Sequence, residues 1–178
     1  MKNNKGFTLI EILASIIILG ILMIIAVPAV SQYIFGSRSS SFATTAKKLI
    51  DTARADITDM EYSVNNKDYT YYIPTSCLET ENGDKTPYGT MQDSYVVVTY
   101  KDGKNNYYYT GMDDSGHGIL LTYSENISGD SVTTDLASIS NRIGIGDRSK
   151  IFVYSTACDG SRTEYDAASY IEEYGTLK

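Results

Sequence analysis

Residues with strong chemical signatures are scarce in this chain of 178 residues, which has no tryptophan, one histidine, two cysteines and three prolines. The histidine, His117, has no cysteine near it and falls short of the ligand set of a zinc site. Its surroundings, residues 113–118, lack the spacing of an EF-hand loop and predict a polar turn. No G-x-S-x-G sequence is present. We therefore expect no cofactor, no metal site and no catalytic residues.

Basic residues are also in deficit, since 15 lysines and arginines stand against 22 acidic residues. A general phosphate-binding surface needs clustered lysine and arginine side chains. This balance argues against such a surface, although a local basic patch remains compatible with it.

One long stretch, residues 7–30, lacks charge apart from Glu11. At about 1.5 Å per residue a helix of this length covers roughly 36 Å, and the hydrocarbon core of a bilayer is about 30 Å thick. A polar leader, residues 1–6, precedes it and contains Lys2 and Lys5. The positive-inside rule places these lysines in the cytoplasm. The sequence predicts a single-pass inner-membrane protein with everything after Val30 outside.

Glu11 makes insertion of such a stretch into a membrane less favourable. A carboxylate costs about 2.5–3.5 kcal/mol at the centre of a membrane helix, and less near its end. Inside a low-dielectric assembly the charge needs a cation. We interpret Glu11 as functional.

The N-terminal sequence KGFTLIE, residues 5–11, resembles the type IV prepilins, the subunits of bacterial type IV pili and of related type II secretion and competence pseudopili. In that family a basic leader ends in glycine, an aromatic residue follows, and glutamate lies four positions later. Gly6, Phe7 and Glu11 occupy these places. Gly20 and Pro28 are two further features of the family's helix. The resemblance covers about the first 30 residues.

Two other interpretations of the N-terminus are less consistent with it. A secretory signal peptide has a 7–15-residue apolar core followed by a small-residue cleavage site, whereas this run is longer and is followed by a poor site. A plain signal anchor explains the length but neither Glu11 nor the Gly6-Phe7 junction.

The resemblance implies that prepilin peptidase cuts between Gly6 and Phe7 and methylates the new amine. An assembly ATPase and a polytopic platform protein then transfer subunits from membrane lipid into a helical surface filament for adhesion, motility or DNA uptake. We expect Glu11 to pair with the cleaved Phe7 amine, either within its own chain or in a neighbouring subunit, and pairing with a neighbour would also set the axial step. Between Gly20 and Pro28 the helix should lose hydrogen bonds most easily.

The main alternative function is that of a pseudopilin in a type II secretion or competence system. An alternative of a different class is a membrane-anchored monomeric binding protein or hydrolase, which would keep an uncut leader. For the pilin interpretation no small-molecule substrate is expected.

Helical periodicity continues past the apolar run into the predicted extracytoplasmic domain, residues 31–178. Apolar residues recur at spacings of three and four, at Phe42, Ala46, Leu49, Ile50, Ala53, Ile57, Met60 and Val64. We expect one helix from Phe7 to about Val64, bent at Pro28, with its second half, residues 31–64, packed on its own domain. Residues 36–41, which are glycine and serine, with one arginine, form its weakest stretch.

The remaining residues predict an α+β architecture, the type IV pilin fold, with the long helix packed on an antiparallel sheet of about four strands. Residues 65–93 contain two prolines and indicate a surface loop. A meander over residues 94–155 should contain strands at 95–100, 106–110, 118–123 and 150–155, with Asp102 and Gly103 at the first turn. Residues 132–143 indicate a short helix. In the C-terminal region, residues 156–178, we expect a helix over 166–174.

The 16 tyrosines concentrate in these strands. On a half-buried sheet a tyrosine packs its ring inward and keeps its hydroxyl in water, so the fold accounts for most of them. Alternation along a strand requires Tyr108 to face away from Tyr107 and Tyr109.

Cys77 and Cys158 both lie on the predicted outer side of the membrane, where disulfides persist. A bridge between them is the favoured interpretation, and two reduced buried thiols or a metal site are the alternatives. The commoner pilin arrangement has both cysteines near the C-terminus, so an adhesive role is not carried over. Acidic residues nearby, Asp159, Glu164 and Asp166, indicate either solvated surface, which we favour, or a calcium loop like that of some pseudopilins.

Overall fold

The computed structural model describes residues 8–59, 64, 69–80, 83, 85–101, 103–134 and 150–166. By its internal contacts the chain divides into two compact units, Met1–Ser37 and Arg38–Lys178. The expected cleavage residues Gly6 and Phe7 lie outside the described residues, as do most of the two predicted C-terminal helices.

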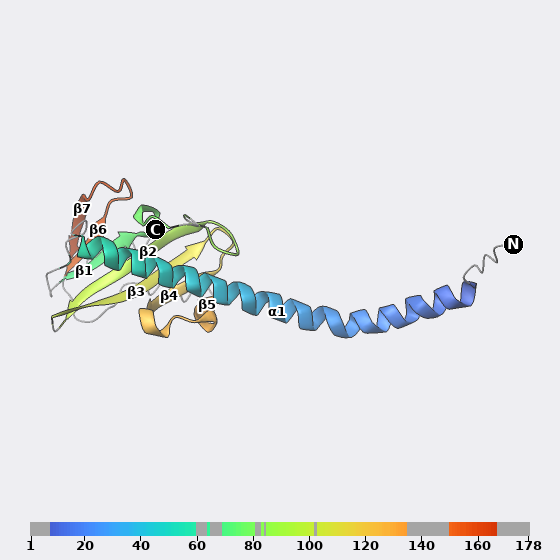
Figure 1. Cartoon of the computed structure of the whole chain (residues 1–178). Helices are drawn as coiled ribbons and strands as arrows, with labels where there is room; N and C mark the ends of the chain where they lie inside the picture. Colours follow the sequence, from blue (N-terminus) through green and yellow to red (C-terminus); the bar gives the residue numbers. More distant parts are fainter. Residues whose placement is uncertain are drawn as a thin grey trace. The chain divides into compact units, whose positions relative to one another are not determined.

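Figure 1 shows one long helix, α1 (Leu9–Thr58). Both Gly20 and Pro28 belong to its sequence. In the first unit its large apolar side chains are exposed from Leu9 to Phe35. The helix ends at Thr58, six residues before the predicted end at Val64. Ile57, Thr58 and Asp59 are all weak helix formers, which explains the early end. Val64 is buried in the core nonetheless, outside the helix.

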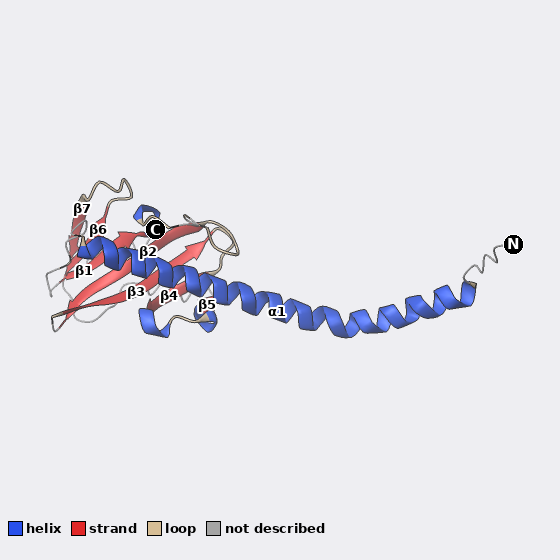
Figure 2. Cartoon of the chain, in the orientation of Figure 1, coloured by secondary structure: helices blue, strands red, loops and turns tan. Residues whose placement is uncertain are grey.

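The second half of α1 buries one stripe of side chains, as its periodicity predicted. Phe42, Ala46, Leu49, Ile50 and Ala53 are almost completely buried. They pack in one cluster with side chains from the sheet, which α1 crosses on one face (Figure 2). Ring contacts reinforce this packing, since Phe42 meets Tyr109 edge to face with centroids 6.5 Å apart.

The sheet contains seven described strands in the order β5-β4-β3-β2-β1-β6-β7. These strands are β1 (Tyr69–Pro74), β2 (Met91–Lys101), β3 (Lys104–Asp113), β4 (Gly118–Tyr123), β5 (Val132–Thr133), β6 (Lys150–Tyr154) and β7 (Arg162–Asp166). Short 3-10 turns interrupt the connections at η1 (Thr75–Cys77), η2 (Ser124–Asn126) and η3 (Gly129–Ser131). Neighbouring strands are antiparallel except β1 and β6, which are parallel. The α+β class is therefore confirmed, while the sheet is larger than predicted and mixed.

One predicted segment is wrong, and two predicted helices are wrong at the one end that the structure describes. The expected loop over 65–93 contains β1, whose residues are largely buried. Val132 was assigned to a helix but lies in β5, and Asp166 was assigned to a helix but ends β7. The remaining residues of these two predicted helices, 135–143 and 167–174, lie outside the described part of the chain.

Both faces of the sheet are buried at its centre. Tyr107 and Tyr109 belong to the cluster on the α1 side, whereas Tyr108 packs with the cluster on the other side, which confirms the predicted alternation. In β2, Val97 joins the second cluster while its neighbours join the first.

Candidate assembly and processing site

Thr8 and Glu11 form a capping box at the start of α1. The Thr8 backbone N–H and its hydroxyl both donate to Glu11 Oε2, each at 2.8 Å. In return the Glu11 N–H approaches Thr8 Oγ1 at 3.4 Å, and Thr8 O accepts from the N–H groups of Glu11 and Ile12. Such a box satisfies backbone donors that a helix end leaves unpaired.

This cap assigns Glu11 a role within its own chain that the sequence analysis missed. The signal was present as T-x-x-E immediately before an apolar run. A carboxylate at this position also lies at the positive end of the helix dipole. Both hydrogen bonds from Thr8 reach Oε2, and within the described residues no donor reaches Oε1.

Polar side chains within the apolar stretch and directly after it bond back to their own helix. Ser15 Oγ donates to the Glu11 carbonyl at 2.7 Å, and Ser31 Oγ donates to the Val27 carbonyl at 2.9 Å. Their hydroxyl groups are therefore satisfied without water, as an apolar medium requires.

The surface of α1 between these residues is apolar on all sides. An 18-residue window of the helix reaches a mean hydropathy of 2.9, and none of it is buried within the chain. Length and composition suffice to cross a bilayer. A helix that is hydrophobic all round must be covered by lipid or by other helices.

Gly20 and Pro28 lie in this same part of α1. An added Cβ at Gly20 would meet nothing within 4 Å, so the chain itself does not require glycine there. Pro28 lacks the N–H that would bond to the Ile24 carbonyl. The turn that ends at Pro28 therefore has one backbone hydrogen bond fewer than a regular turn.

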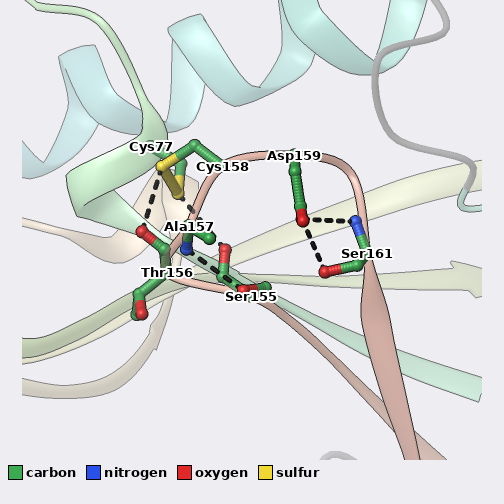
Figure 3. Close-up of a disulfide and its surroundings, with 7 residues drawn as sticks. All are labelled: Cys77, Ser155, Thr156, Ala157, Cys158, Asp159 and Ser161. Atoms are coloured by element: carbon green, nitrogen blue, oxygen red, sulfur yellow. Dashed lines mark hydrogen bonds between the residues drawn. A yellow bond between two sulfur atoms is a disulfide. The ribbon is translucent and has the colours of Figure 1, made fainter.

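Cys77 and Cys158 are joined by a disulfide across 81 positions, with Cα atoms 5.2 Å apart (Figure 3). Cys77 lies in η1, directly after β1, and Cys158 lies between β6 and β7. The bridge therefore joins the connections that follow the two parallel strands. Cys77 Sγ lies 3.4 Å from the Ser155 carbonyl oxygen, and Cys158 Sγ lies 3.4 Å from the Thr156 carbonyl oxygen. Because a disulfide sulfur carries no proton, both are van der Waals contacts.

The connection between β6 and β7 is closed by local hydrogen bonds, which Figure 3 shows beside the disulfide. Ser155 Oγ accepts from the Ala157 N–H, and Asp159 Oδ1 accepts from the N–H and hydroxyl of Ser161. The bonds from Ser161 lower the pKa of Asp159. Cys158 has a φ of 58°, a left-handed conformation that is uncommon without glycine. Within the described residues no group of three potential ligands is arranged for a metal ion.

His117 lies in the turn between β3 and β4, as predicted, beside Ser115 and the buried Asp113. Ser115 Oγ donates to Asp113 Oδ1 at 2.7 Å, so its 2.9 Å contact with His117 Nδ1 must be one that it accepts. In a catalytic triad the histidine instead takes the proton of serine. This trio is therefore arranged to hold the turn, and Tyr88 stacks on the His117 ring with centroids 3.8 Å apart.

A family model described as the prokaryotic N-terminal methylation motif matches residues 1–27. A fimbrial protein of Dichelobacter nodosus is 32% identical over 114 residues, which cover 58% of this chain and 71% of the relative. A type IV major fimbrial protein FimA of the same organism is 29% identical over 134 residues, or 75% of each chain. No solved structure matches the chain significantly.

The capping box predicts that the Thr8 hydroxyl stabilises the first turn of α1. Thr8→Val keeps the shape and removes the hydroxyl, and we expect a loss of about 1 kcal/mol at the helix start. Amide hydrogen exchange of Glu11 and Ile12 in detergent micelles should become about five-fold faster, while exchange in residues 49–58 stays unchanged. Thr8→Ser is the matched control and should behave as the wild type. Equal exchange in the two variants would contradict the cap.

The disulfide predicts a local effect on β6 and β7. Closing a loop of this length contributes roughly 4–5 kcal/mol by chain entropy, so the Cys77→Ser, Cys158→Ser variant should unfold at lower denaturant concentration. Amide protection should fall most in β6 and β7. Cys158 lies between these two strands, and β7 is at the edge of the sheet with β6 next to it. Ser155→Ala, which removes only a turn hydrogen bond, is the control. Because the entropic contribution acts on the whole unfolded chain, protection in β2 and β3 should also fall, but by less, and an unchanged denaturation midpoint would contradict the stabilising role.

Proposed function

The chain belongs to the type IV pilin family, and on that premise we propose that it is stored in the membrane as a prepilin and polymerised into a surface pilus. The observation that supports the proposal is the match of residues 1–27 to the methylation motif. The first half of α1, which contains most of these residues, is apolar on every side. Prepilin peptidase would cut between Gly6 and Phe7 and methylate the new amine. A platform protein and an assembly ATPase would then draw the subunit from lipid into the filament.

The start of the helix is compatible with the proposed position of the cut. Regular helix begins at Leu9, and Thr8 caps it, so the Gly6-Phe7 bond precedes the helix in the sequence. Lys2 and Lys5 favour a cytoplasmic leader, which would present this bond at the inner face of the membrane. Gly6 adds no side chain at the bond to be cut.

Assembly would exchange one apolar environment for another. In the membrane, lipid covers the exposed side chains of α1, and in the filament the corresponding helices of other subunits would cover them. Subunits related by a head-to-tail, non-closing step form a fibre. The second unit, Arg38–Lys178, would then form the outer wall.

Glu11 would connect processing to assembly. Cleavage creates a positive charge on Phe7, and burial of the Glu11 carboxylate among helices requires a cation. Thr8 occupies Oε2, so a Phe7 amine of the neighbouring subunit would bond to Oε1 and fix the axial step between subunits. The cap would hold the carboxylate in place before its partner arrives.

A pilus subunit is favoured over a secretion pseudopilin because the relatives are fimbrial proteins, one of them described as a major fimbrial protein. A monomeric membrane-anchored hydrolase is not favoured, since Ser115 and His117 have the wrong hydrogen-bond direction for a triad.

Processing predicts a defined mass. The native subunit should correspond to residues 7–178 plus one methyl group, measured on the intact protein. Gly6→Val, which places a branched side chain at the cut, should leave the precursor full length, and Gly20→Val is the control that should still be cut. A native subunit that begins at Met1 would refute the prepilin hypothesis.

The role of Glu11 predicts a separation of insertion from assembly. Glu11→Ala should be inserted and cleaved normally, because removing a charge favours insertion, yet should form few filaments. Glu11→Gln should be nearly as defective, because the amide keeps the shape and loses the charge. Ser15→Ala removes a neighbouring polar group and should assemble as the wild type does. Electron microscopy of sheared filaments measures the yield, and wild-type yields from Glu11→Ala would rule the role out.

A further inference from the structure

Three bulky side chains follow the apolar run of α1: Tyr33, Ile34 and Phe35, with 78%, 44% and 59% of their surface exposed. Successive residues of a helix are rotated by about 100°, so the three point in different directions. They form a collar around the helix and not a stripe along it. One partner helix covers a stripe, so in a subunit that is not yet in a filament a collar is covered by the medium that surrounds the helix.

The position of this collar matches the thickness of a bilayer. From Leu9, the first helical residue, a hydrocarbon core of about 30 Å takes up 20 residues and ends near Ala29. Tyr33 lies about 6 Å further along the axis, and Phe35 about 9 Å further. The headgroup region adds roughly 5–7 Å on each side, and an average tilt of about 20° brings both residues closer to it.

The side chains of the collar suit this depth. Tyrosine is enriched where a membrane meets water, because its ring is apolar and its hydroxyl needs a polar neighbour. Gln32 and Arg38, both exposed, mark the change from apolar to polar sequence on either side of the collar. Arg38 is long enough to reach water or lipid phosphates while its stem remains near the acyl chains.

We propose that Tyr33, Ile34 and Phe35 bind the boundary between headgroups and acyl chains in the outer leaflet and fix the depth of the stored subunit. The proposal rests on the membrane-stored prepilin proposed above. Leu9 and Tyr33 are about 36 Å apart along the helix axis, between the roughly 30 Å of the hydrocarbon core and the roughly 40–45 Å of a whole bilayer. The collar on one side and the leader lysines on the other therefore hold the Gly6-Phe7 bond at the cytoplasmic surface.

The absence of tryptophan makes a depth measurement direct. Four single-tryptophan variants of the full chain, Ile17→Trp, Tyr33→Trp, Phe35→Trp and Thr44→Trp, are reconstituted at low protein-to-lipid ratio. The vesicles contain phosphatidylethanolamine and phosphatidylglycerol with a nitroxide placed either near the headgroup or deep in the acyl chain. Ile17 is the control for the centre of the span, and Thr44, exposed on the second half of α1, is the control for water.

We expect the shallow nitroxide to quench the fluorescence at positions 33 and 35 more than the deep one, the deep nitroxide to dominate at position 17, and neither to act at position 44. If positions 33 and 35 behave like position 44 while position 17 is deep, the collar lies in water and the inference is wrong. If they behave like position 17, the collar lies in the hydrocarbon core and the inference is also wrong. If position 17 itself is not quenched, membrane storage fails, and both proposals fail with it.

A second measurement tests whether the collar sets the depth. Tyr33→Ser and Phe35→Ser are introduced together into the Ile17→Trp protein, and we expect the ratio of shallow to deep quenching at position 17 to shift. Gln32→Ser in the same protein is the control and should leave the ratio unchanged. An unchanged ratio in the double variant would show that the collar does not hold the helix.

Discussion

Exposure of the first half of α1 to water is unfavourable, because its large apolar side chains from Leu9 to Phe35 are exposed around the whole helix. Full burial of each would contribute about 1.5–3 kcal/mol, so the chain needs a second environment over this length. Lipid and a bundle of identical helices are two environments that supply the same contacts. A subunit that can exchange one for the other at similar free energy can be stored and then assembled without refolding.

The second half of α1 buries its apolar side chains within its own unit, against the sheet. Small residues at its start allow close packing from two sides. Ser39 Oγ bonds to the Tyr88 hydroxyl at 2.9 Å, and a Cβ at Gly129 would come within 3.2 Å of the Ser40 nitrogen. These serines have a low helix propensity, but their contacts with Tyr88 and Gly129 hold the helix against the rest of its unit. The buried stripe begins directly after them, at Phe42.

Those features that depend on local sequence were predictable. The stripe of α1, the β2–β3 hairpin and the opposite orientation of Tyr108 follow from spacing alone. β1 was missed because its pairing is not local: its partners are β2, across a connection of 16 residues, and β6, far along the chain and parallel. Its sequence, YTYYIP, is aromatic on both faces, so it lacks the alternation that marks a half-buried strand.

At the candidate site, too, the sequence motif was predictable and the hydrogen-bond geometry was not. The sequence identified Glu11 as too costly to be accidental, and the T-x-x-E spacing indicates a cap, but neither shows which carboxylate oxygen the cap uses. The structure places Thr8 one helical turn before it, with two hydrogen bonds to a single oxygen. These bonds reduce the penalty of a carboxylate near lipid, because a satisfied charge at a helix N-terminus is less costly than a bare one. Because they use only one of the two oxygens, the bonds from Thr8 would not have to break if a neighbouring amine bound to Glu11 as proposed.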